Sequence, residues 1–355
     1  MNRFSNNATQ ASKNERILYL DYLRVLATFA VILLHVSAQN WHETNVNTYQ
    51  WQIFNFGDSI SRWCVAAFVM ISGALFLNRR CSIRIIYTKY VLRLVTAALF
   101  WGFLYALLLG GGPKELLLYT IKGRYHLWFI PMIIGMYICI PIIKKITESL
   151  SITRYFLALA FIFAFLLPQF TSFVNDFGTG LFKDIISAIN SNITDMNFHL
   201  VLGYTVYFIL GYYLVKTDLS YRQKRGICLL GIASFLFTIA ADSYLSLRLQ
   251  TPSGRFYGDF TVNVLFESIF VFVLFKYRCP CSDKLNKIVI LLSKYSFGAY
   301  LVHVMILEQL AKMGLTTMAF SPVVSIPVIW SITAVLAFAV SAVIHQVPIL
   351  KKYVV

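Results

Sequence analysis

The sequence has few charged residues, and acidic residues are the scarcer kind. Of its 355 residues only 13% are charged, with 15 Asp and Glu against 31 Lys and Arg. A soluble domain has about 25% charged residues, so this composition, together with 58% hydrophobic residues, excludes an ordinary water-soluble enzyme. The 30 Phe and 21 Tyr exclude a disordered chain, which lacks apolar surface to bury. A membrane protein with several spans remains.

The sequence also lacks a separate basic domain, a repeat of fixed period and a low-complexity linker. The excess of cations therefore does not indicate a nucleic-acid partner. Residues 1–355 are best treated as one membrane domain. The first 16 residues are polar and no small-residue cleavage site ends the apolar run that follows, so we expect a cytoplasmic tail and not a secretory signal.

Cysteine is scarce, and its positions do not suggest a disulfide or a metal site. No two of the six cysteines are placed as a disulfide on the outer side of the membrane would require. Cys279 and Cys281 have too few potential ligands nearby for a zinc site, which usually needs four. We expect no bound metal.

Long apolar runs recur along the whole chain. A bilayer span needs about 20 apolar residues, and ten runs approach that length. They lie near 17–38, 58–77, 91–110, 126–143, 155–172, 199–215, 226–246, 260–276, 288–311 and 323–346. Pro131 and Pro141 interrupt the fourth run, and a short surface helix is expected near 181–190. The sequence therefore predicts an all-α polytopic membrane protein of about ten transmembrane helices.

The distribution of cations predicts the topology. A cytoplasmic N-terminus places 22 of the 31 cations in inner segments and 8 in outer ones, with Arg24 inside a span. Because positive residues concentrate on the cytoplasmic side, both termini are expected to be cytoplasmic.

Ionisable residues in the first run indicate a functional site. Asp21 and Arg24 are three residues apart and can pair on one helical face. Arg24 and His35 are eleven apart, which places them on nearly the same face and about 16 Å apart along the axis. Snorkelling to the inner interface would explain Arg24 alone, but it does not explain His35 on the same stripe.

Two further histidines, His126 and His303, fall at the same outer depth as His35 on different expected spans. Three histidines at one level suggest a site open to the outer face. We interpret His42, His199 and His345 as structural. Glu267 and Glu308 could each orient a histidine or bind a hydroxyl, and a polar contact between helices explains each equally well. Ser72-Gly73 favours a small-residue packing notch.

Lys89 and Arg93 are four residues apart at the start of the third run, on what should be one helical face. Such a pair suits a phosphate-rich ligand, because arginine binds phosphate with a rigid fork. Cytoplasmic bias and anionic lipid explain the neighbouring Arg79, Arg80 and Arg84.

Four segments together resemble the membrane acyltransferase-3 family, and the likeness spans nearly the whole chain. They are Leu20-Asp-Tyr-Leu-Arg24 followed by His35, Phe68-Val-Met-Ile-Ser-Gly-Ala-Leu, the basic Lys89/Arg93 start, and His126-Leu-Trp-Phe129 with Ser296-Phe-Gly-Ala-Tyr-Leu-Val-His303. Val69 stands where the family pattern has Phe. No soluble esterase-like domain is expected after the last span. Within this family, the sequence most resembles bacterial members that O-acetylate cell-surface polysaccharides.

The resemblance implies an O-acetyltransferase of the bacterial inner membrane that uses cytoplasmic acetyl-CoA and a glycan or lipid-linked sugar outside. Lys89, Arg93 and Arg24 would bind the donor. His35 would act as general base, and Arg24 would hold the donor or stabilise developing negative charge. His126, Trp128, Tyr300, His303 and Glu308 would bind the acceptor. Direct transfer and an acyl-histidine intermediate both stay open, and the sequence also allows a homo-oligomer. A transporter or flippase, with Arg and His as a relay, is the alternative.

Overall fold

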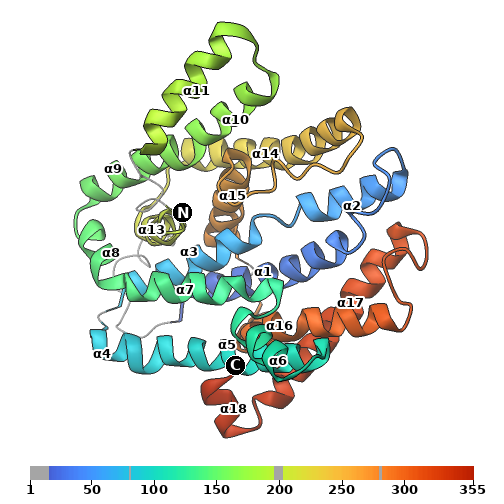
Figure 1. Ribbon diagram of the computed structural model, residues 1–355. Coiled ribbons are helices and arrows are strands. Elements are labelled where there is room, and N and C mark those ends of the chain that lie inside the picture. Colours follow the sequence, from blue (N-terminus) through green and yellow to red (C-terminus); the bar gives the residue numbers. More distant parts are fainter. Residues whose placement is uncertain (1–15, 80, 196–202, 280–281) are drawn as a thin grey trace.

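The computed structural model describes residues 16–79, 81–195, 203–279 and 282–355, and the regular secondary structure in these ranges is helical (Figure 1). The helices are α1 Leu18–Ala38, α2 Tyr49–Ser59, α3 Cys64–Leu77, α4 Ile83–Ile85, η1 Ile86–Val91, α5 Leu92–Leu109, α6 Pro113–Lys122, η2 Tyr125–Trp128, α7 Phe129–Ile138, α8 Ile140–Thr147, α9 Leu150–Ala160, η3 Phe161–Leu166, α10 Leu167–Phe177, α11 Gly180–Asp195, α13 Thr205–Lys216, α14 Tyr221–Leu249, α15 Val262–Arg278, α16 Asp283–Lys312, α17 Pro322–Ile344 and α18 Pro348–Tyr353. The all-α prediction is confirmed. The expected tail and His199 lie outside the described residues.

Each of the ten apolar runs contains a helix, but the helices differ in length. Among the described residues, seven continuous helical stretches are long and apolar enough to cross a membrane, and the number rises to eight if one bent pair is counted. The bent pair is η2 and α7 with α8, which meet at 61° beside Pro141. The other two runs give α13, with 12 residues, and α15, with 17, which fall short of that length. The expected surface helix is present as α11. The protein is therefore a multi-pass membrane protein.

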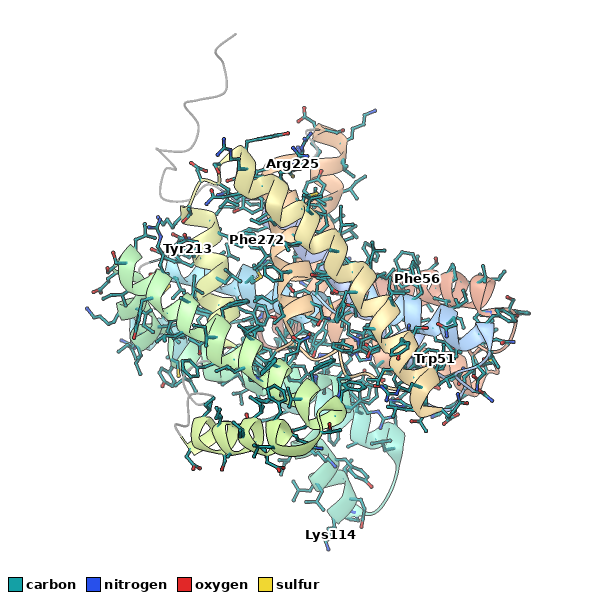
Figure 2. All side chains as sticks on the ribbon, turned by 90° about the horizontal axis from the view of Figure 1, so that it is seen from above. Trp51, Phe56, Lys114, Tyr213, Arg225 and Phe272 are labelled. Carbon is teal, nitrogen blue, oxygen red and sulfur yellow. The ribbon has the colours of Figure 1, made fainter. Side chains whose placement is uncertain are left out.

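Helix α1 lies in the interior, where it packs against α2, α3, α15, α16 and α17. Leu23, Ala27 and Ile32 on this helix are fully buried. Outward faces are apolar as well: Ile142 and Val335 are 70% and 68% exposed. Exposed apolar surface of this kind suits contact with lipid. Figure 2 shows the same contrast between the interior Phe272 and the peripheral Phe56.

Helices α3 and α13 approach each other so closely that their backbones touch. A Cβ added at Gly73 would lie 1.8 Å from the carbonyl oxygen of Phe208, and one at Gly211 would lie 2.0 Å from that of Met70. Glycine at these two positions permits the contact, because any side chain would collide with backbone. The expected packing notch at Ser72-Gly73 is present, and Gly73 forms it.

The basic segment before α5 is a π-helix, η1, in which hydrogen bonds join residues five apart. Lys89 lies in η1, where it is exposed and lies over the Tyr90 ring. Arg93 lies in the first turn of α5 and is exposed as well, but its side chain also lines an internal cavity. Lys89 and Arg93 therefore do not border the same space.

Candidate active site

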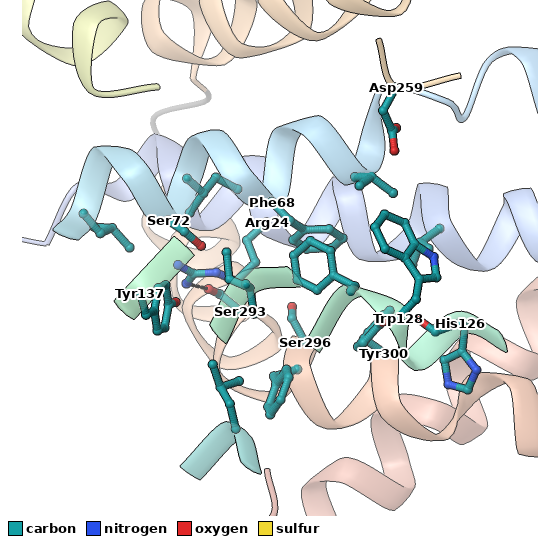
Figure 3. Close-up of a pocket in the computed structure, with 18 of the residues that line it drawn as sticks. Arg24, Phe68, Ser72, His126, Trp128, Tyr137, Asp259, Ser293, Ser296 and Tyr300 are labelled. Carbon is teal, nitrogen blue, oxygen red and sulfur yellow. Dashed lines mark hydrogen bonds between the residues drawn. The ribbon is translucent and has the colours of Figure 1, made fainter. Parts of the chain in front are cut away.

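An elongated cavity of about 740 Å3 lies among α1, α3, α5, α7 and α16. Figure 3 shows Arg24, Ser72, Tyr137 and Ser293 at one end of it, and His126, Trp128, Asp259 and Tyr300 at the other. Helix α1 follows the cavity from Arg24 to His35, a distance of about 16 Å along its axis. We call the two ends the arginine end and the histidine end.

Among the described residues, four cations line the arginine end: Arg24, Arg79, Arg93 and Lys294. The expected pair between Arg24 and Asp21 is confirmed, with Nη1 3.3 Å from Oδ1. Nη1 also donates to Ser293 Oγ at 2.9 Å, and this hydroxyl donates to Asp21 at 2.6 Å. Asp21 is also bonded to Arg16, so one carboxylate holds both Arg16 and one nitrogen of the Arg24 guanidinium, which borders the cavity.

Arg93 lines the cavity and Lys89 does not. The Arg93 guanidinium donates to the carbonyl oxygen of Val355, and Thr96, one turn further along α5, donates to the carbonyl oxygen of Tyr353 at 2.5 Å. These bonds hold the segment after α18 against the start of α5 (Figure 1). They also fix the direction in which the Arg93 side chain extends.

The histidine end brings together three histidines from α1, η2 and α16. His35 and His126 line the cavity, and His303 lies behind them, fully buried. The His303 ring centroid is 5.1 Å from that of His35 and 5.1 Å from that of His126. Tyr300 lines the same end and donates to the carbonyl oxygen of His126, which connects α16 to η2.

A second group at the histidine end was not predicted from the sequence. Arg62, Tyr257 and Asp259 line the cavity beside Trp128. The Arg62 guanidinium is paired with buried Asp58 and lies 3.9 Å from the centroid of the Tyr257 ring. Burial raises the pKa of the Asp259 carboxyl, which lies between α14 and α15, while the charge of Arg62 acts in the opposite direction. This end therefore presents a cation, a carboxyl group and aromatic rings together.

Asp259 is held in place from α13. Its Oδ2 accepts a hydrogen bond from the Tyr204 hydroxyl at 2.5 Å, and its backbone carbonyl oxygen accepts one from Tyr207 at 2.5 Å. The Tyr204 ring in turn lies 5.8 Å from the Trp128 ring. These contacts leave the second carboxyl oxygen of Asp259 available at the cavity wall.

Several expected site residues lie outside the cavity lining. Glu308 forms an ion pair with Arg124 at the start of η2, with Arg124 Nε 2.7 Å from Oε1. Glu267 is buried between α14 and α15, where it accepts a hydrogen bond from Thr238 at 2.5 Å. His42 and His345 contact Trp41 and Tyr295. Across the described residues, no group of three or more His, Cys, Asp or Glu side chains is arranged to hold a metal ion.

Comparison with known proteins identifies the family of this chain. The acyltransferase-3 family model, described as an acyltransferase domain, matches residues 17–346. The chain therefore belongs to the acyltransferase-3 family, and the protein is a membrane acyltransferase. Neither a curated protein nor a solved structure matches this chain.

Proposed function

We propose that this protein transfers an acetyl or other short acyl group from cytoplasmic acyl-CoA to a hydroxyl of an extracytoplasmic or lipid-linked glycan. The supporting observation is the one cavity that has cations at one end and imidazoles at the other. The donor carries phosphates at one end of a long flexible arm and its reactive thioester at the other. A donor bound along α1 would place these two parts at the arginine and histidine ends.

The arginine end suits the phosphates of the donor. Arg93 of α5, Arg79 in the turn after α3 and Lys294 of α16 border the same space. Guanidinium groups bind phosphate through two parallel N–H donors, and lysine adds a point charge. Arg24 lies deeper in the same end, where its ion pair with Asp21 leaves the rest of the fork for the donor.

The histidine end suits a sugar. Trp128 is 45% exposed and offers an aromatic face to the apolar side of a pyranose ring. The free oxygen of Asp259 can accept a hydrogen bond from a sugar hydroxyl, and bonds of this kind to a charged group are the stronger ones. Tyr300 and Tyr257 complete the wall on either side.

His35, which lines the histidine end, would act as the general base. It would take the proton from the acceptor hydroxyl while that oxygen attacks the thioester carbon. The new C–O bond forms, the C–S bond breaks, and the proton passes from His35 to the departing sulfur of CoA. Arg24 lies too far along α1 to contact the same atoms, so we assign stabilisation of the developing negative charge to Arg62.

The test uses cells that express either the wild-type protein or His35→Ala, with mass spectrometry of their purified surface glycan. The variant should lose acyl transfer by about 10²–10⁴-fold, the usual cost of removing a general base. The purified variant should still bind acetyl-CoA, because the phosphate contacts lie at the other end. A variant that acylates the glycan at the wild-type rate would remove His35 from the mechanism. A wild-type protein that does not bind acetyl-CoA would favour the transporter alternative.

A further inference from the structure

The three clustered histidines are not equivalent, because backbone carbonyls fix the tautomers of two of them. Nδ1 of His303 lies 2.6 Å from the carbonyl oxygen of Tyr300. A carbonyl oxygen can only accept, so Nδ1 carries the hydrogen and Nε2 carries a lone pair. In the same way His126 Nε2 lies 3.4 Å from the carbonyl oxygen of Leu301, which leaves the lone pair on Nδ1.

Both lone pairs are buried without a donor. Nε2 of His303 and Nδ1 of His126 have no hydrogen-bond partner among the described side chains and backbone. A buried acceptor left unpaired costs free energy, and a native structure usually has a reason for one. The two rings cannot satisfy each other, since each offers a lone pair to the other.

His35 is the neighbouring ring that can supply the missing donor to His303. Two imidazoles joined by an in-line N–H···N bond have centroids about 5 Å apart, from a bond of about 3 Å and two ring radii. His35 and His303 are 5.1 Å apart, whereas His35 and His126 are 6.3 Å apart. A rotation of the His35 ring would therefore make the bond to His303 without moving either helix.

We propose that His303 is a positioning residue whose Nε2 accepts a hydrogen bond from His35, which fixes the other His35 nitrogen as a free base facing the cavity. This inference rests on the proposed role of His35. When His35 takes the acceptor proton, both of its nitrogens carry hydrogen, and the bond to His303 becomes charge-assisted. His303 orients the base, as the third member of a catalytic triad does, and itself exchanges no proton.

Two substitutions of His303 separate this role from a structural one. In His303→Asn the amide NH2 falls near the position of Nδ1, so the bond to Tyr300 is kept and the acceptor toward His35 is lost. In His303→Gln the amide oxygen falls near the position of Nε2, so the acceptor is kept and the bond to Tyr300 is lost. Turnover and the KM for acetyl-CoA are measured for both proteins, with glycan-bearing membranes as acceptor.

Loss of a group that orients a functional side chain typically costs 10–100-fold, so His303→Asn should lose about that much in kcat with the KM for acetyl-CoA unchanged. His303→Gln should recover most of the loss. The opposite order, with Asn active and Gln inactive, would show that only the bond to Tyr300 matters and would overturn the proposal. If His303→Asn is active while His35→Ala is inactive, the proposal for His303 is overturned, but the proposed function still stands.

A spectroscopic measurement covers the case in which neither variant folds. In wild-type protein labelled with 15N-histidine, the unprotonated nitrogen of His303 should be Nε2, with a chemical shift typical of a hydrogen-bond acceptor. That shift should move to the value of a free lone pair in His35→Ala. A shift that is the same in both proteins would overturn the proposal.

Discussion

At the scale of single residues, Arg93 and Lys89 are four residues apart, but only Arg93 lines the cavity. Arg93→Ala should weaken binding of acetyl-CoA by about 10–100-fold, because hydrogen bonds to charged groups contribute about 1.5–3 kcal/mol. The same variant should weaken binding of 3′-dephospho-CoA less, because that ligand lacks the 3′-phosphate that Arg93 is expected to contact. Lys89→Ala is the matched control and should stay within about 2-fold of wild type, because surface charges far from a ligand contribute little. Calorimetry on the purified proteins checks both.

An equal loss of affinity in both variants would show that the donor phosphates lie outside the cavity, over the exposed face of η1. The sequence could not distinguish these positions. A spacing of four residues places two side chains on one side of a helix, but it does not show that only Arg93 reaches the cavity. The pair between Asp21 and Arg24 was predictable because α1 is regular there.

The residues that sequence reasoning missed fall into two kinds. Ser293 and Ser296 precede Tyr300 and His303, which the sequence did indicate, at intervals of three, four and three residues, so their place on the same face of α16 could have been predicted. Asp259 and Tyr257 lie in the segment between α14 and α15, which has no periodicity. Their place beside Trp128 depends on how α13 and α15 pack, and that packing is not encoded in any local pattern.

At the scale of helices, the contact between α3 and α13 depends on two glycines. Gly73→Ala should destabilise the protein by about 1–3 kcal/mol, the usual cost of overpacking, because the added methyl group collides with backbone at Phe208. Thermal unfolding in detergent should show a lower midpoint. Activity should fall as well, since Ser72, which lines the cavity, directly precedes Gly73 on α3.

Gly226→Ala provides the control for that experiment. Gly226 also lies in a helix, α14, but a Cβ added there meets no atom within 4 Å. Alanine is favoured over glycine in a helix by roughly 0.5–1 kcal/mol, so this variant should be as stable as the wild type or slightly more stable. A Gly73→Ala protein that unfolds at the wild-type temperature would show that α3 and α13 can separate without cost.

At the scale of the whole molecule, the proposed reaction requires that the cavity be open from end to end. Ser72 lies on α3 beside the Arg24 guanidinium at the arginine end, where its side chain borders the space (Figure 3). Ser72→Phe should place a ring across the path of the donor arm. Acyl transfer should fall at least about 100-fold, while adenosine 3′,5′-bisphosphate, which has the donor phosphates and no arm, should still bind. The expected loss corresponds to more than about 2.7 kcal/mol.

Ser72→Ala is the control and also tests a nucleophilic role. It keeps the cavity open, so it should transfer acyl groups at close to the wild-type rate. A large loss of rate in this variant would mean that the hydroxyl itself takes part. Normal transfer by Ser72→Phe would show that the donor does not pass between the two ends.

The orientation of the molecule in the membrane is the remaining property on which the direction of transfer depends. Arg225 and Trp51 lie toward opposite ends of α14 (Figure 2), a helix of 29 residues that is about 43 Å long. Gln52 of α2 accepts a hydrogen bond from Ser243 near the far end of α14, at 2.7 Å. The segments 40–57 and 217–225 are therefore on opposite sides of the bundle, and the cation distribution predicts that 217–225 is cytoplasmic.

Cysteine labelling of intact cells tests this prediction. Glu43 and Gln223 are both exposed, so each can be replaced by cysteine in a protein whose native cysteines have been removed. A membrane-impermeant maleimide should label Glu43→Cys from outside, and it should label Gln223→Cys only after the cells are opened. The opposite pattern would place the arginine end outside, where no acyl-CoA is available. The cation-lined end would then need a different ligand, and the proposed transfer from acyl-CoA would be overturned.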